Sequence, residues 1–193
     1  MIASQDRSYY IGASDVEKVI GNWKTKSWHK WWMQKIAIDN AHFDNIYTLA
    51  GTHFEHRILE SLGIPMEFDK QFINEELRLR VNLDGNTDDV NYECKTTKED
   101  IKLFKPPKKY INQTQVQMFG SKLRHTKLVV YQLVEEDYNN FFRPIDKRRL
   151  RIFDVPYNEE WVQGIYLPKH LMLRDCLEKG VMPDESFTMQ TNC

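Results

Sequence analysis

The sequence has too few cysteines for a disulfide framework or a cysteine-ligated metal cluster. Its three cysteines are Cys94, Cys176 and Cys193, and no two of them form a Cys-x-x-Cys pair. A structural zinc or iron–sulfur site usually uses four thiolates. We therefore expect neither disulfide bonds nor a cluster held by cysteine.

Long apolar runs and an excess of one charge are also missing. No apolar run approaches the roughly 20 residues that span a bilayer, and residues 1–10, MIASQDRSYY, lack the apolar stretch of a secretory signal. These absences predict a cytoplasmic protein without membrane contact. The chain has 27 basic and 28 acidic residues, so any nucleic-acid site must be a local patch.

The length is typical of one domain. A chain of 193 residues can bury a substantial core, and the sequence contains neither an internal repeat nor a low-complexity segment. We therefore expect residues 1–193 to form a single domain.

Apolar periodicity predicts helices in the first third of the chain. Ser14 is suited to cap a short helix over 15–20, and residues 27–38 carry tryptophans at helical spacing. Between residues 43 and 62 an apolar residue recurs at every fourth position, and Gly63 then provides a stop. This region is expected to be helical throughout.

Alternating residues then predict a β-hairpin. Residues 77–84 have leucine or valine at every second position, with polar residues between them. Residues 90–95 form the next expected strand, and the turn-forming residues 85–89 separate the two strands. In such a strand Glu93 and Lys95 project to the same side.

The rest of the sequence predicts further helices and strands. They are a helix over 108–123, a strand over 128–134, a strand over 149–155, and a helical region from about 158 that Pro168 breaks or kinks, leaving a second piece over 169–179. This order of elements indicates an α/β fold.

The predicted hairpin carries the residues of a metal-dependent hydrolase. Asp84 and Glu93 come from adjacent strands, and Lys95 follows two positions after Glu93. Mg²⁺ prefers oxygen ligands and is commonly held by one or two carboxylates. Such a cation polarises a phosphate and activates a water, while an ammonium group orients the nucleophile or neutralises developing charge. The sequence therefore predicts a magnesium site at this hairpin.

Simpler interpretations of these residues stay open. Glu93 and Lys95 also fit an ordinary ion pair, and Asp88 and Asp89 are rival ligands to Asp84.

Other aromatic and basic residues allow two interpretations each. Trp28, Trp31 and Trp32 either pack in the core or stack on bases. The histidines at 53 and 56 are more often hydrogen-bonded surface residues than ligands. Basic residues gather at 105–109 and 143–151, and such runs are either solvated faces or phosphate contacts.

Three further motifs, in order along the chain, resemble those of the phage recombination exonucleases. Residues 7–14, RSYYIGAS, are similar to the N-terminal segment that helps to hold a DNA 5′-phosphate in that family. Residues 51–55, GTHFE, are similar to its helix motif, in which a glutamate points at the metal site. Tyr110 followed by residues 113–117, QTQVQ, is similar to its alternating-glutamine helix. These enzymes are the lambda exonuclease-like, YqaJ-type branch of the PD-(D/E)xK nucleases.

The resemblance implies a fold and a set of site residues. The implied fold is restriction-endonuclease-like, with a mixed central sheet flanked by helices. The implied metal ligands, for Mg²⁺ or for Mn²⁺ in its place, are Glu55, Asp84, Glu93 and the main-chain carbonyl of Cys94. The chain departs from the family in its short length and in having Cys94 where an aliphatic residue is commoner.

The resemblance also implies roles for four other residues. Lys95 and Gln115 assist the attack of water, together with the catalytic carboxylates of the hairpin. Arg7 and Ser14 bind the DNA 5′-phosphate. A helix N-terminus beside a guanidinium is physically suited to an anion.

The implied substrate is linear double-stranded DNA that is degraded from a 5′-phosphorylated end. The product is a 3′ single strand for a single-strand annealing protein, in a bacterial or phage-infected host cell. The family's ring-shaped trimers imply a homo-oligomer. Two alternatives stay open, which are a structure- or sequence-specific endonuclease and an inactive DNA-end or protein-binding module. The clustered acids argue against the inactive module, because binding alone does not require them.

Overall fold

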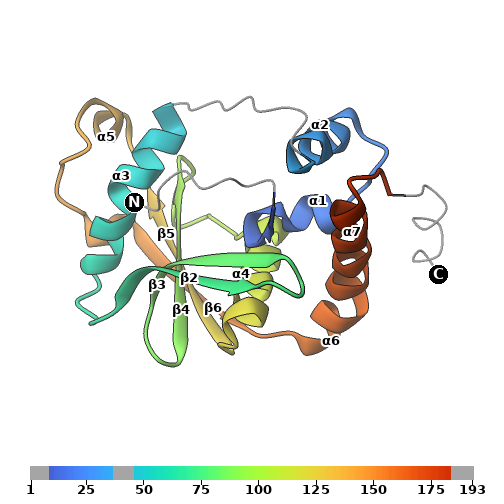
Figure 1. The fold of residues 1–193 in the computed structure, drawn as a ribbon. Helices are drawn as coiled ribbons and strands as arrows, with labels where there is room; N and C mark the ends of the chain where they lie inside the picture. Colours follow the sequence, from blue (N-terminus) through green and yellow to red (C-terminus); the bar gives the residue numbers. More distant parts are fainter. Residues whose placement is uncertain (1–8, 37–45, 184–193) are drawn as a thin grey trace.

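A six-stranded mixed sheet forms the centre of the structure, and helices cover both of its faces (Figure 1). The computed structural model describes residues 9–36 and 46–183. The strands are β1 (Ile11–Gly12), β2 (Glu67–Asn74), β3 (Leu79–Asn86), β4 (Val90–Thr97), β5 (His125–Gln132) and β6 (Leu150–Pro156). The predicted α/β class is therefore confirmed.

One edge of β3 is only partly paired. Its other edge pairs antiparallel with β2 along almost the whole strand. On the partly paired edge, β1 contacts Leu79 and Arg80, and β4 contacts Gly85 and Asn86. Between these two contacts, residues 81–84 have no paired strand on this edge in the described chain. β4 continues parallel to β5, and β5 pairs antiparallel with β6.

The helices pack on opposite faces because alternate residues of a strand point to opposite sides. Tyr131 of β5 packs with Phe54 of α3, whereas Val130 packs with Met118 of α4. The helices are α1 (Val16–Ile20), α2 (Lys26–Lys35), α3 (Ile46–Glu60), α4 (Lys108–Ser121), α5 (Glu135–Asn139), α6 (Glu159–Trp161) and α7 (Leu167–Lys179), with η1 (Ala13–Asp15), η2 (Lys147–Arg149) and the π-helical η3 (Val162–Tyr166).

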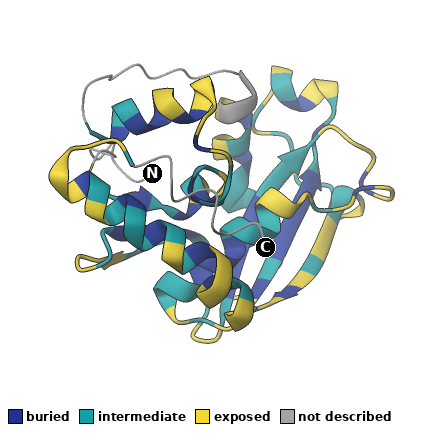
Figure 2. Cartoon of the chain, turned by 90° about the vertical axis from the view of Figure 1, so that its right-hand side faces the viewer, coloured by how far each residue is buried: buried dark blue, intermediate teal, exposed yellow. Residues whose placement is uncertain are grey.

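The tryptophans of α2 belong to the core. Trp28 and Trp32 are 2% and 0% exposed, and their rings stack with centroids 5.5 Å apart. They share a cluster with Val19 of α1 and Leu173 of α7. The core interpretation is confirmed, and stacking of these rings on DNA bases is excluded by their burial. Figure 2 shows the same pattern, with buried central strands beneath helices whose outer faces are exposed.

The hairpin prediction is confirmed, with shifted bounds. β3 continues two residues beyond Asp84, so this residue lies within the strand and not at its end. The turn shortens to residues 87–89. The predicted cap at Ser14 is wrong, because this residue lies inside η1 and Asp15 precedes α1.

Pro168 does not break the C-terminal helix. It lies in the first turn of α7, directly after the π-helical segment η3. A proline in an α-helix clashes with the carbonyl four residues earlier and lacks an N–H donor. The wider π-turn before it accommodates the ring, so the helical path continues.

No helix in the described chain is both long and apolar enough to span a bilayer.

A buried histidine attaches α7 to the start of β3. His170 is 0% exposed; its Nε2 lies 2.8 Å from the Leu77 carbonyl oxygen, and its Nδ1 lies 2.9 Å from the Tyr166 hydroxyl. Nε2 must therefore donate to the carbonyl, and in the neutral ring Nδ1 accepts from the hydroxyl. Burial lowers the pKa of His170 from 6.5 to about 4.

We expect His170 to make stability depend on pH in the acid range. The unfolded ring takes up a proton near pH 6.5 and the folded ring only near pH 4, so this contribution is complete above 6.5 and is lost as the pH falls towards 4. The full loss is about 3 kcal/mol. Urea unfolding of the wild type and His170→Gln, which keeps a donor but does not titrate, should diverge by this amount. Parallel pH profiles would contradict the assignment.

Candidate active site

Four of the predicted site residues, Ser14, Asp84, Glu93 and Lys95, line a gap along the edge of β3. A cavity of about 160 Å³ occupies this gap. Its lining combines residues from η1, α2, β3, β4 and α4, which are Gly12, Ala13, Ser14, Asp15, Lys35, Arg80, Asn82, Asp84, Glu93, Lys95, Gln113 and Gln117. The site therefore depends on β3 and β4 diverging after a two-residue contact.

Glu93 is the most buried acid of the site, with 1% exposure. Its Oε1 accepts a hydrogen bond from Gln113 Nε2 at 2.7 Å and forms an ion pair with Lys95 Nζ. Its Oε2 accepts from Gln117 Nε2 at 2.5 Å. A buried carboxylate needs such donors, because without them the loss of hydration strongly disfavours the charged form.

The orientation of Gln117 is set by a second layer of polar residues. Its Oε1 accepts from Asn91 Nδ2 at 3.1 Å, and its Nε2 also donates to the Asn82 carbonyl at 3.0 Å. The amide nitrogen must therefore face Glu93. α4 reaches this position because it packs closely on β3. A Cβ at Gly120 would lie 2.8 Å from the side chain of Val81, so a larger residue does not fit there.

Asp84 faces β4 across the gap. Its Oδ2 accepts from the Cys94 main-chain N–H at 2.8 Å, in place of the missing strand pairing. In an extended strand the N–H and the carbonyl of one residue point to the same side, so the Cys94 carbonyl also points towards Asp84. Burial and the neighbouring carboxylates of Glu93 and Glu55 raise the pKa of Asp84 well above its usual value.

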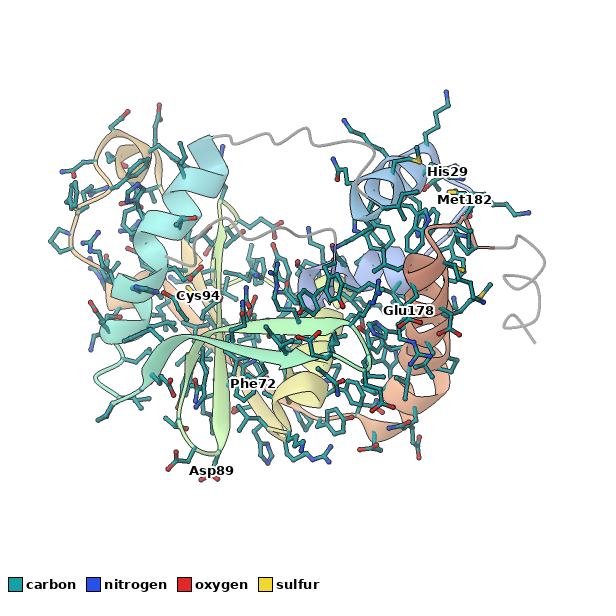
Figure 3. All side chains as sticks on the ribbon, in the orientation of Figure 1. His29, Phe72, Asp89, Cys94, Glu178 and Met182 are labelled. Carbon is teal, nitrogen blue, oxygen red and sulfur yellow. The ribbon has the colours of Figure 1, made fainter. Side chains whose placement is uncertain are left out.

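The Cys94 side chain points away from the gap. It is 5% exposed and belongs to the cluster that α3 covers, and burial raises the pKa of its thiol. Figure 3 shows Cys94 next to α3 and Asp89 at the distant tip of the β3–β4 turn. Asp88 and Asp89 are exposed there. Asp84, and neither of these two residues, lies at the site.

Glu55 comes from α3 and interacts with two groups of residues. Burial and the Glu93 carboxylate raise its pKa to about 7. Within the described chain, the tight cluster of three potential ligands is Glu55, His56 and Asp69, whose ligand atoms lie within 4.8 Å of one another. His56 Nε2 also lies 3.2 Å from Asp69 Oδ2. Glu55 therefore lies between this outer cluster and the acids of the gap.

Lys95 keeps its charge inside the protein. Burial lowers its pKa, but the carboxylates of Glu93 and Asp84 outweigh that effect and raise the pKa above its usual value. Its Nζ also lies 5.7 Å from the centre of the Tyr110 ring. The ammonium group is therefore a permanent positive charge beside the acids.

The prediction that Gln115 lies beside Lys95 is wrong. Gln115 donates to the Pro156 carbonyl at 3.0 Å and accepts from the Asn158 N–H at 2.6 Å, so it joins α4 to the end of β6. Residues 113 and 117 share a helix face because they are four positions apart, whereas 115 lies about 200° around the helix. The spacing of the three glutamines contained this information, since only one pair of them can face the strand together.

The predicted phosphate-binding residues lie at the η1 end of the cavity. Ser14 lines it, whereas Arg7 lies outside the described residues. η1 is held by Asp15, which accepts from Gly12 N–H at 2.9 Å and from Trp31 Nε1 at 3.0 Å, and pairs with Lys35 Nζ at 2.7 Å. A fixed turn therefore places Ser14 at this cavity.

The other histidine and two arginines of the second basic run make structural contacts. The His53 ring stacks on Phe141 with centroids 5.0 Å apart. Arg143 and Arg149 both pair with Asp137, which is 0% exposed. These arginines stabilise a buried charge, so their proximity in sequence is explained without a phosphate.

The donor set suits a divalent cation. Asp84, Glu93 and the Cys94 carbonyl are oxygen donors, as Mg²⁺ prefers. Burial and, after it, the neighbouring carboxylates raise the pKa values of Asp84 and Glu55, and a bound cation would favour their charged forms. The outer cluster contains the imidazole of His56, which suits transition metals better than Mg²⁺. The gap is therefore the better candidate magnesium site.

Comparisons with known proteins identify solved structures with a similar fold. The chain is similar to an alkaline exonuclease from Laribacter hongkongensis, with a TM-score of 0.70 and 19% identity over 90% of each chain, and to a structure of that enzyme with dAMP with the same values. It is also similar to a phage related exonuclease from Haemophilus somnus 129PT, with a TM-score of 0.60 and 15% identity over 88% of this chain and 95% of the other.

The fold is that of the restriction-endonuclease-like proteins, as expected. The profile of the YqaJ-like viral recombinase domain matches residues 4–123, which is more than half of the chain. The chain belongs to this family. Among curated protein sequences, none matches it.

We expect Asp84→Asn to stabilise the protein when no metal is present. The amide oxygen still accepts from Cys94, while one of the clustered charges is removed, so the free energy of unfolding should rise by about 1 kcal/mol. Urea unfolding at pH 8 with EDTA measures this change. Asp88→Asn is the control on the exposed turn, and should change stability by less than about 0.5 kcal/mol. A loss of stability in Asp84→Asn would contradict the proposed charge excess.

We expect the three glutamines of α4 to separate by function. Gln113→Ala and Gln117→Ala should lower nuclease activity per folded molecule by about tenfold or more, because each removes a donor to Glu93. Gln115→Ala should lower thermal stability but leave the activity of the folded fraction unchanged. Activity assays corrected for the folded fraction by circular dichroism test this. An activity loss confined to Gln115→Ala would restore the original assignment.

Proposed function

We propose that this protein is a metal-dependent exonuclease that degrades linear double-stranded DNA from 5′-phosphorylated ends in phage-type recombination. The observation that carries the proposal is the meeting of Asp84, Glu93 and Lys95 in the gap of the sheet, in a chain of the YqaJ-like viral recombinase family. The solved structures to which it is similar include exonucleases, and one of them holds dAMP.

The proposed metal ligands are Asp84, Glu93 and the Cys94 carbonyl, with Glu55 joining them from α3. A bound Mg²⁺, or Mn²⁺ in its place, would polarise the scissile phosphate and lower the pKa of a water. The Glu93 carboxylate is buried, and three donors fix its orientation: Lys95 of β4, and Gln113 and Gln117 of α4.

Lys95 is proposed to stabilise the charge that develops during hydrolysis. Its ammonium stays protonated beside Glu93, so it neutralises negative charge on the phosphate oxygens as the water attacks. Gln113 takes the assisting role first predicted for Gln115, because its amide lies at Glu93. In this position it orients the carboxylate and donates to a substrate oxygen.

The proposed preference for a 5′-phosphorylated end rests on the other end of the cavity. Arg7 and Ser14 are the proposed phosphate contacts. Ser14 lines the same cavity as Lys95, together with Lys35 and Arg80. Lys35 is paired with Asp15, so Lys95 and Arg80 are the cations that favour a second phosphate group at a short distance from the acids. A strand whose first phosphate binds here would present the next one to Asp84 and Glu93.

Residues 1–193 are proposed to act as one nuclease domain in the cytoplasm of a bacterial or phage-infected cell. DNA is the proposed substrate, and a single-strand annealing protein that receives the 3′ strand is the proposed partner. A homo-oligomer, by analogy a trimer, is proposed as well. These proposals rest on the family to which the chain belongs.

The decisive experiment is a Mg²⁺-dependent digestion time course with two substrates, a linear 5′-phosphorylated duplex and closed circular DNA. We expect only the linear DNA to be degraded, and we expect Lys95→Ala to lower the rate by about 100-fold or more. Lys127→Ala, on the exposed side of β5, controls for loss of any lysine. A 5′-hydroxyl duplex run in parallel tests the end preference.

Each other result supports a different function. Cutting of the circle would favour an endonuclease on the same fold. Absence of lysine-dependent cutting with both Mg²⁺ and Mn²⁺ would favour a DNA-end or protein-binding module. Calorimetric titration with Mn²⁺ then shows whether the acids still bind a cation.

A further inference from the structure

The outer cluster of Glu55, His56 and Asp69 differs in chemistry from the gap. Glu55 and His56 are consecutive residues of α3, and Asp69 comes from β2. One ligand atom from each of them lies within 4.8 Å of the other two. The cluster therefore combines an imidazole nitrogen with two carboxylates, whereas the donors of the gap are all oxygens.

Asp69 has a backbone conformation that is unusual within a strand. The β2–β3 ladder pairs Phe68 with Gly85 and Lys70 with Leu83, while Asp69, between these pairs, has a φ of 55°. This left-handed region is uncommon for residues other than glycine. It takes the Asp69 side chain out of the regular alternation of the strand, and the carboxylate lies 3.2 Å from Nε2 of His56 on α3.

The spacing of these atoms is close to that of a tetrahedral metal site. Zn²⁺ binds nitrogen and oxygen ligands at about 2.1 Å, so the ligand atoms of such a site lie about 3.4 Å apart. His56 Nε2 and Asp69 Oδ2 already have this separation. A small movement of the Glu55 carboxylate, which starts within 4.8 Å of both, completes the set.

The surroundings of the cluster allow a cation to enter and to be held. The side chains of His56 and Asp69 are 41% and 29% exposed, so both can be reached from solvent. The His56 ring packs against Phe68 with centroids 5.0 Å apart, which restricts its orientation. A protonated His56 brings one positive charge to two carboxylates, whereas a divalent cation neutralises both.

We propose that Glu55, His56 and Asp69 bind a second divalent cation, a transition metal of the Zn²⁺ type, in a site distinct from the magnesium site of the gap. Three protein ligands leave the fourth position of a tetrahedral ion for water, and the imidazole favours such an ion over Mg²⁺. The cation joins α3 to β2, and so fixes the helix that carries Glu55 beside the gap. This inference goes beyond the proposed nuclease function and does not depend on it.

The test is calorimetric titration of metal-free Asp84→Asn with Zn²⁺, since this background weakens the gap and isolates the outer cluster. We expect one Zn²⁺ to bind, and we expect adding His56→Gln to lower the affinity by about 100-fold or more. Adding Asp69→Gly should have the same effect. Glycine adopts the left-handed conformation without strain, so this variant removes the carboxylate and keeps the fold.

Two further measurements identify the ligands. Co²⁺, used as a coloured substitute for Zn²⁺, should give the visible absorption of a tetrahedral site in Asp84→Asn and lose it when His56→Gln is added. Zn²⁺ should raise the melting temperature of Asp84→Asn but not that of the two cluster variants. His53→Gln is the matched control, because His53 belongs to the same helix and stacks on Phe141 away from the cluster. It should bind Zn²⁺ as strongly as the background.

The outcomes separate this inference from the proposed function. Unchanged Zn²⁺ affinity in both cluster variants would overturn the inference, because the cation would then bind elsewhere. Absence of Zn²⁺ binding in the Asp84→Asn background would overturn it as well, and would leave His56 and Asp69 as an ion pair only. These measurements use no DNA, so a failure of the nuclease proposal in the digestion experiment leaves them unaffected.

Discussion

The burial of the Glu93 carboxylate is the interaction on which the rest of this structure depends. A charge with 1% exposure loses most of its hydration, at a cost of several kcal/mol. Lys95, Gln113 and Gln117 replace that hydration with direct donors. This requirement determines how closely α4 must pack on β3, and why a glycine stands at position 120 where the two elements touch.

The gap in the sheet makes this burial useful. Pairing of β3 and β4 along their full lengths would place a main-chain ladder where the cavity now lies. Because the pairing stops after Gly85 and Asn86, the Asp84 carboxylate takes the place of a strand partner for Cys94. Burial and the proximity of the acids to one another raise the pKa values of Asp84 and Glu55, so the charged forms of these residues are disfavoured in the protein alone.

Local patterns in the sequence predicted the elements that the site requires. The alternation around 77–84 and 90–95 identified the hairpin, because a half-buried strand has a period of two. That period also placed Glu93 and Lys95 on one side, as the structure has them. The face of α4 that meets the sheet was harder to predict from the sequence. Choosing Gln115 over its neighbours needed knowledge of which face of α4 meets the sheet, and this depends on packing against β3 and β6. Of the break or kink predicted at Pro168, the break does not occur, because a π-helical turn before the proline lets the helical path continue.

The sequence by itself determined the chemistry of this protein, namely the acids, the lysine, the glutamines and the family motifs that hold them in order. It also determined that Asp84 lies on the polar side of its strand, because residue type and period are local properties. Only the tertiary structure decided that β3 has an open edge, that Asp88 and Asp89 point away at the turn, and that Gln113 and Gln117 hold Glu93. These features arise from contacts between residues far apart in the chain, which no local period records.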